Sequence, residues 1–198
     1  MPSKALKNWQ RSLIKQLDPL RTIHADLTGR RSGRPRTTQQ VVDAYIILLS
    51  GLFQQYCRDV YQEAVDEVVA AVAIPRLHPV LYKNFQWSLE LGSKNAQPSS
   101  LGSDFGRLGM DFWARLRSRD SRSRTRQNKL ESLNVWRNAV AHQDFVRNDD
   151  FNKKAGKTRR TLAYAEDWRA ALTALASDID AAMSAHLVWL LSLPSLPW

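Results

Sequence analysis

The chain has 198 residues, of which 43% are hydrophobic, and it contains eight glycines and eight prolines. This length suits one domain, and the hydrophobic content is enough for a buried core. So few glycines and prolines disfavour a loop-rich β-sandwich and favour long helices. The formal net charge of +10 predicts an acidic partner, and nucleic acid is the commonest one.

Cysteine content and hydropathy predict in which cellular compartment the protein lies. Cys57 is the only cysteine, so no disulfide can form within the chain and we expect a reducing environment. Because it lies in an apolar run, Cys57 is predicted to be a buried structural thiol. The polar N-terminus shows no apolar secretory segment, and the longest apolar stretches, 44–53 and 187–193, are shorter than the ~20 residues of a membrane span. We therefore expect a cytoplasmic protein without membrane contact.

The first part of the chain predicts two helices. The spacing of apolar residues favours a helix over 4–27, which Pro19 can kink, followed by a basic loop over 29–36. Thr37 and Gln40 fit a capping box for a helix over 38–73, which is apolar almost all round in its first half. A helix that is apolar on every side belongs in the middle of a bundle.

The rest of the chain predicts shorter helices joined by polar loops, and one long helix at the end. The expected helices span 78–92, 103–117, 127–142 and 162–193, and the loops span 93–102, 119–126 and 148–161. Ser103 and Asp104 are expected to cap the helix that begins there. The fold is therefore expected to be all-α, an up-and-down bundle of about five or six helices around the long central one. It forms a single domain over 1–198, with its core at about 38–193 and an N-terminal helix and basic loop at 1–36.

The end of the helix at 127–142 carries a group of polar residues that can act on RNA. Asn138 and His142 are four residues apart and so share a helix face, and Arg137 lies on the neighbouring strip. Leu133 and Trp136 belong to the apolar face of the same helix, beside these polar residues. The three polar groups can thus cluster at one helix end, where a protonated imidazole is favoured by the terminal carbonyls.

These residue types suit phosphodiester cleavage without a metal. RNA supplies its own nucleophile, the 2′-hydroxyl next to the scissile phosphate. His142 can move protons near neutral pH, and the guanidinium of Arg137 can stabilise the charge that builds on the phosphate. Asn138 can donate to a phosphate oxygen or hold the imidazole in one tautomer.

The segment from Arg137 to His142 resembles the Arg-x-x-x-x-His motif of the HEPN superfamily, in which a polar residue often follows the arginine, as Asn138 does here. The run 46–59, IILLSGLFQQYCRD, resembles the long core helix of RiboL-PSP-HEPN and toxin-type HEPN families of prokaryotes, with Phe53 and Tyr56 at their F-x-x-Y step. The resemblance covers about 38–190, and the helix at 127–142 is its specific part. Many members have a glycine directly after the histidine, where this chain has glutamine and aspartate.

The resemblance implies a helical bundle that dimerises, with the two motifs facing each other across a cleft. It implies metal-independent RNA cleavage that leaves a 2′,3′-cyclic phosphate, in a toxin of a toxin–antitoxin pair or a phage-defence effector. Carried over to this chain, Arg137 and His142 are catalytic and Asn138 supports them. The expected partners are RNA, a second copy of the chain that completes the active site, and an antitoxin or defence protein.

A second basic region precedes this helix, where seven arginines fall between Arg107 and Arg126. Such a surface can follow a phosphate backbone. The neighbouring Phe112 and Trp113 are predicted to pack in the core rather than to stack on bases. The expected nucleic-acid contacts are Arg115, Arg117, Arg119, Arg122, Arg124 and Arg126.

Two other functions are open. The chain could be a non-catalytic module that binds nucleic acid or a partner and carries a vestigial motif. It could also be a DNA-binding regulator, because the segment 33–36, Gly-Arg-Pro-Arg, is similar to arginine hooks that enter A·T-rich minor grooves. A plain basic loop is the simpler interpretation of that segment.

Other candidate features predict little chemistry. His24, His78 and His186 have no Cys, His or carboxylate partner at metal-ligand spacing, so we expect neither a metal nor another cofactor. The apolar tail over 187–198, with Trp189 and Trp198, can pack within the bundle, join a homodimer or receive a partner protein.

Overall fold

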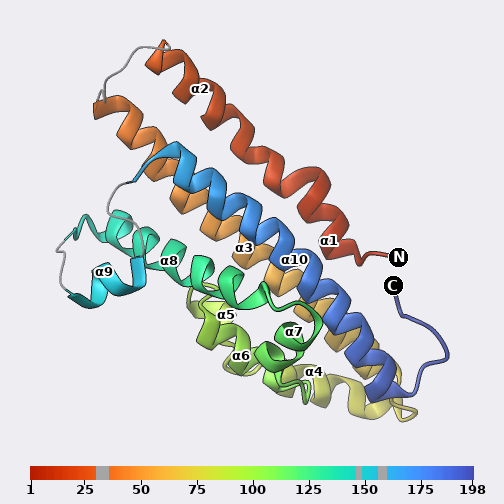
Figure 1. Cartoon of the computed structure of the whole chain (residues 1–198). Coiled ribbons are helices and arrows are strands. Elements are labelled where there is room, and N and C mark those ends of the chain that lie inside the picture. The colour runs from red at the N-terminus through yellow and green to blue at the C-terminus, as the bar shows by residue number, and fades with distance from the viewer. Residues whose placement is uncertain (30–35, 146–148, 156–159) are drawn as a thin grey trace.

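The computed structural model describes residues 1–29, 36–145, 149–155 and 160–198, and its regular elements within these ranges are all helices (Figure 1). The all-α prediction is confirmed. The elements are α1 (Lys4–Asn8), a π-helical turn (Trp9–Leu13), a 3-10 turn (Ile14–Leu17), α2 (Asp18–Thr28), α3 (Arg36–Ala70), a 3-10 turn (Pro75–Leu77), α4 (His78–Gln86), α5 (Glu90–Ser93), α6 (Pro98–Gly106), α7 (Phe112–Arg119), α8 (Ser123–His142), α9 (Asp149–Ala155) and α10 (Leu162–Leu191).

Helix α3 is the axis of the bundle. Its 35 residues correspond to ~52 Å at 1.5 Å per residue, and it packs against α1, α2, α8 and α10. In Figure 1, α3 and α10 run side by side, and α8 crosses them on one flank. Tyr56 ties the pair together, because its buried hydroxyl donates to the carbonyl of Ala176 at 2.7 Å. The thiol of Cys57 lies in this core as predicted, and burial raises its pKa well above the ordinary value.

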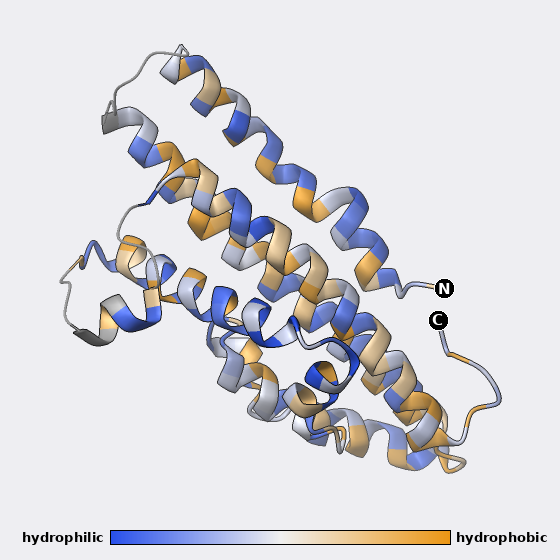
Figure 2. Ribbon diagram, in the orientation of Figure 1, coloured by the Kyte–Doolittle hydropathy of each residue, from blue (hydrophilic) through white to orange (hydrophobic). Residues whose placement is uncertain are grey.

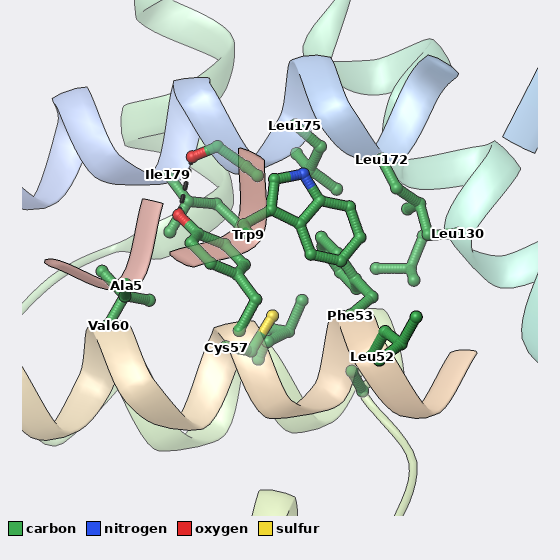
Figure 3. Packing of buried hydrophobic residues seen from close by; sticks show 14 of the residues in the cluster. Ala5, Trp9, Leu52, Phe53, Cys57, Val60, Leu130, Leu172, Leu175 and Ile179 are labelled. Carbon is green, nitrogen blue, oxygen red and sulfur yellow. Dashed lines mark hydrogen bonds between the residues drawn. The ribbon is translucent and has the colours of Figure 1, made fainter. Parts of the chain in front are cut away.

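The N-terminal segment is a layer of the core rather than an appendage. Trp9 is fully buried, and its ring lies 5.7 Å from that of Phe53 and 5.8 Å from that of Tyr56. Figure 3 shows the indole lodged between α3 and α10. Expecting the core to begin near residue 38 was therefore too narrow, because Trp9, Leu13 and Leu17 belong to it.

The region between α4 and α8 differs most from the expected elements. The single helix expected over 103–117 is two helices, because the chain turns at Gly109, whose φ of +76° suits glycine. Asp104 does not cap that helix. It lies inside α6, fully buried, and accepts hydrogen bonds from the backbone amides of Glu90 and Leu91 at the start of α5.

Two predicted loops contain helix. Helix α8 begins at Ser123, so most of the expected basic loop over 119–126 is helical, and α9 lies within the expected loop over 148–161. The basic segment predicted at 33–36 falls almost entirely outside the described residues. Within the described residues, α10 alone is long and apolar enough to cross a membrane by length and composition, and half of that window is buried against the bundle.

We expect Trp9→Ala to lower the free energy of unfolding by about 3–5 kcal/mol, because it removes a large aromatic group from a closed core. Urea denaturation followed by far-UV circular dichroism measures this change. Trp87→Ala is the control, because the Trp87 side chain is 67% exposed and its loss should cost no more than about 0.5 kcal/mol. Equal effects of the two substitutions would contradict this account of the core.

Candidate functional site

The sequence-predicted trio lies at the C-terminal end of α8. The Nη1 of Arg137 donates to Oδ1 of Asn138 at 3.1 Å, and His142 follows one turn later. Arg137 and Asn138 are partly buried, while His142 is exposed. The helix ends at once after it, because Gln143 adopts a left-handed φ of 53° and the amide of Asp144 donates back to the carbonyl of Ala139.

A second asparagine holds Asn138 in place. The Nδ2 of Asn95 donates to Oδ1 of Asn138 at 2.8 Å, so this oxygen accepts hydrogen bonds from both Asn95 and Arg137. One turn earlier, Nδ2 of the buried Asn134 donates to the carbonyl of Ala96 at 2.9 Å. The segment after α5 is thus hydrogen-bonded along one face of α8. On this face Asn134 is buried, Asn138 is partly buried and His142 is exposed.

Arg160 fixes the other side of the same helix end. It pairs with both carboxylate oxygens of Asp43 on α3, at 2.9 and 3.0 Å. Its guanidinium carbon also lies 4.1 Å from the centre of the Phe145 ring and 5.9 Å from that of Trp136. Burial raises the pKa of the Asp43 carboxyl despite the arginine beside it. Arg160 therefore joins α3, α8 and the chain that follows α8, just before α10 begins.

The electrostatics of the trio suit an anion that approaches from solvent. None of the carboxylates in the described ranges forms an ion pair with Arg137, and the imidazole of His142 makes no hydrogen bond to a described residue. The three described cavities lie elsewhere, with linings that do not include the trio. Because His142 is exposed at the helix end, an anion can approach the trio from solvent.

The predicted basic surface lies at the opposite end of α8. Arg124 and His142 are 18 residues apart on one helix, which corresponds to about 27 Å. In Figure 1, α8 runs from its start beside α7 to its end beside α9, and Figure 2 shows strongly hydrophilic ribbon at the junction of α7 and α8. The structure thus separates two groups of site residues that the sequence had left unplaced relative to each other.

The six arginines of the basic surface are not equivalent. Arg126 is largely buried and forms ion pairs with Asp120, at 3.0 Å, and with Asp178, so it holds α8 to α10. Arg122 pairs with Asp120 at 2.9 Å, and its hydrogen bonds hold the pKa of that carboxyl well below the ordinary value. The arginines that have no ion pair with a described carboxylate are Arg115, Arg117, Arg119 and Arg124.

The remaining sequence candidates are structural or lie apart. Phe112 is buried and Trp113 packs on the core with Nε1 donating to the carbonyl of Pro98, as predicted. His78 contacts the carbonyl of Val72. Within the described ranges, no three His, Cys, Asp or Glu side chains gather as a metal site would require.

Asn95 and Arg160 are the site residues that sequence reasoning missed. Both fall in segments expected to be plain polar loops, and their contacts join residues 43 and 117 positions apart. Local spacing gives no signal for such pairs. A scan against protein-family models and searches of curated proteins and of solved structures found no match to this chain.

Arg160→Ala should lower the free energy of unfolding by about 1–3 kcal/mol, because it leaves the partly buried Asp43 without its cation and removes a contact with two aromatic rings. Chemical denaturation measures the loss. The matched control is Arg124→Ala, an exposed arginine expected to change stability by less than about 0.5 kcal/mol. A fully stable Arg160→Ala would rule out this role for Arg160.

Proposed function

We propose that the protein is a metal-independent endoribonuclease of the HEPN kind, and that Arg137, Asn138 and His142 form its catalytic site. The observation that supports this most is the geometry at the end of α8. There a guanidinium and an amide are hydrogen-bonded to each other, and an exposed imidazole follows one turn later. The trio is neither sealed within the bundle nor tied up by carboxylates of the described residues.

In the proposed reaction, the 2′-oxygen of a ribose attacks the adjacent phosphorus as an imidazole accepts its proton. A new P–O2′ bond forms, the P–O5′ bond breaks, and the departing 5′-oxygen takes a proton. The products are a 2′,3′-cyclic phosphate and a free 5′-hydroxyl, so no water or metal enters this step. Arg137 stabilises the charge on the phosphate oxygens, and Asn138 holds Arg137 in place.

A second copy of the chain would complete the site. In-line attack places the entering and departing oxygens on opposite sides of the phosphorus. One imidazole can reach only one of these oxygens, so a second proton-transfer group is needed for the other. In a homodimer whose two trios face one cleft, His142 accepts the proton from the 2′-hydroxyl and the partner's His142 donates to the 5′-oxygen. A dimer would also convert the open surface at the end of α8 into a groove.

The basic surface would position the rest of the RNA. Arg124 lies about 27 Å along α8 from His142, and Arg115 and Arg119 lie on α7, which contacts α8. An RNA of several nucleotides is therefore needed to reach from these arginines to His142. Their loss should weaken binding and reduce its salt dependence without changing the chemical step. A toxin or phage-defence effector, restrained by an antitoxin or defence partner, is the setting that the HEPN resemblance implies.

Purified wild-type protein should cleave single-stranded RNA in the presence of EDTA. His142→Ala and Arg137→Ala should each lower kcat by about 100-fold or more, because each removes an acid–base group or a charge stabiliser. Gel analysis of a labelled RNA measures the rate. His24→Ala and Arg124→Ala are the matched controls. The first should leave the rate unchanged, and the second should raise KM while leaving kcat near the wild-type value.

Equal kcat for wild type, His142→Ala and Arg137→Ala would rule out the proposed site. Activity that EDTA abolishes would contradict the metal-independent mechanism.

Asn95→Ala should lower kcat several-fold, to about tenfold, with KM nearly unchanged, because Asn138 then loses the donor that orients it. Steady-state kinetics separate the two constants, and a melting curve checks that the fold is intact. The control is Asn84→Ala, an exposed asparagine on α4. Unaltered kcat in Asn95→Ala would show that Asn138 does not depend on this contact.

A non-catalytic RNA-binding module is the second candidate. The observation in its favour is that Oδ1 of Asn138 already accepts two hydrogen bonds from neighbouring side chains, as a purely structural residue would. This function predicts salt-sensitive RNA binding that survives His142→Ala, and no cleavage by the wild type.

A further inference from the structure

A cavity on the far side of the molecule from the trio combines features that suit a nucleotide. It has a volume of about 450 Å³ and lies between α7 and the C-terminal part of α10, two helices in contact. Its lining includes Asp111, Arg115, Ser118, His186 and Trp189. Figure 1 shows α7 beside α10, at the end of α8 that is opposite to the trio. The volume lies within the range of small-molecule sites.

An aromatic surface borders this cavity. The Trp189 side chain is 67% exposed although it belongs to a core helix, and its ring lies 5.6 Å from that of His186 at an interplanar angle of 33°. His186 is 98% buried, and its Nε2 lies 2.8 Å from the carbonyl of Leu108. Because a carbonyl only accepts, Nε2 carries the hydrogen, and this bond fixes the imidazole beside the indole.

Polar groups of both charges complete the lining. Asp111 caps α7 through Oδ1, which accepts from the amide of Ala114 at 3.2 Å. Its Oδ2 has no hydrogen bond to the described residues and can accept from a ligand. Arg115 has no ion pair with a described carboxylate, and Arg119 lies one turn further along the same helix face. Nδ1 of His186 likewise makes no hydrogen bond within the described ranges.

We propose that this cavity binds one unstacked nucleotide of a single-stranded RNA, with the base stacked on Trp189, its amino group donating to Asp111, and the flanking phosphates on Arg115 and Arg119. An indole face, a carboxylate acceptor and a guanidinium match the three parts of such a nucleotide. A single strand is favoured over a duplex, because flipping a base out of a duplex costs unstacking and unpairing energy. The inference rests on the proposed function for RNA as the ligand, but it does not require cleavage.

Binding at this cavity would define the path of the RNA strand along α8. A base held at this cavity anchors one part of the strand, and the arginines on α7 lead from it toward the start of α8. The trio lies a further 27 Å or so along that helix. The anchored nucleotide therefore lies several nucleotides away from the scissile phosphate along the RNA. The cavity thus selects the substrate without contacting the reacting atoms.

The test measures binding in a background that cannot cleave. Fluorescence anisotropy of a labelled 12-nucleotide single-stranded RNA is recorded with the full chain carrying His142→Ala. Adding Trp189→Ala should raise Kd about tenfold, as loss of one stacked base does, and Trp189→Phe should recover part of the affinity. Trp87→Ala is the matched control, because Trp87 is equally exposed at 67% and lies outside the cavity lining. It should leave Kd within twofold.

The preference for one base over another tests whether Asp111 accepts a hydrogen bond from the bound base. The protein should bind an all-adenine 12-mer more tightly than an all-uracil 12-mer, because uracil has no exocyclic amino group. Asp111→Asn, which keeps a capping side chain on α7, should remove that preference. Binding of adenosine monophosphate as tight as that of the 12-mer would overturn the assignment to an RNA strand.

Equal Kd values for the Trp189→Ala and Trp87→Ala proteins would overturn the inference, as would a chain that binds neither RNA. Trp189-dependent binding by a wild-type protein that never cleaves RNA would uphold the cavity and contradict only the nuclease proposal.

Discussion

The rotation of α8 about its own axis is the constraint that positions the candidate site. Leu133 and Trp136 are buried in the core that α8 shares with α3 and α10. With that face fixed, Asn134, Asn138 and His142 must follow the neighbouring face, from the interior out to solvent. A turn of the helix by one residue would bury the imidazole or swing Asn138 away from Asn95. Apolar packing therefore sets the polar geometry, as it does for sites built on rigid elements.

The same helix also separates binding from chemistry. Its first turns follow an arginine-rich segment, and its last turn carries the trio. Ion pairs hold the first end, where Arg126 joins Asp120 and Asp178, and Arg160 holds the other end through Asp43 and Phe145. Two of the most deeply seated arginines thus serve the fold, which leaves the exposed arginines on α7 for phosphate. The net charge of the chain therefore overstates the positive charge that is available to bind nucleic acid.

Periodicity in the sequence predicted the elements whose partners are apolar. The central helix, the helix with the motif and the long final helix all follow from apolar spacing, because burial of one face sets that spacing. The buried state of Cys57, Phe112 and the residues around Trp136 follows in the same way. The sequence misled where one residue serves a neighbouring element or turns the chain. Asp104 looks like a helix cap, yet it accepts from amides of a different helix, and Gly109, with its positive φ, divides the helix expected over 103–117.

The candidate site was predictable only in its local part. Arg137, Asn138 and His142 share one helix end, so their proximity follows from helix geometry alone. Asn95, Arg160 and the cavity beneath Trp189 depend on contacts between segments far apart in sequence, for which a single sequence carries no periodic signal. The relation of the arginine-rich segment to the trio also required the structure, because residues 119–126 were expected to be a loop, whereas α8 begins at Ser123 and continues to His142.

The chemistry of the cut ends tests the central claim most directly. Mass spectrometry of the fragments from a defined RNA, digested by the wild-type protein in EDTA, identifies the groups on both sides of the cut. We expect a 2′,3′-cyclic phosphate and a 5′-hydroxyl, and no cut at a position where the ribose carries a 2′-deoxy substitution. A 5′-phosphate with a 3′-hydroxyl, or cleavage that persists at the 2′-deoxy position, would contradict it.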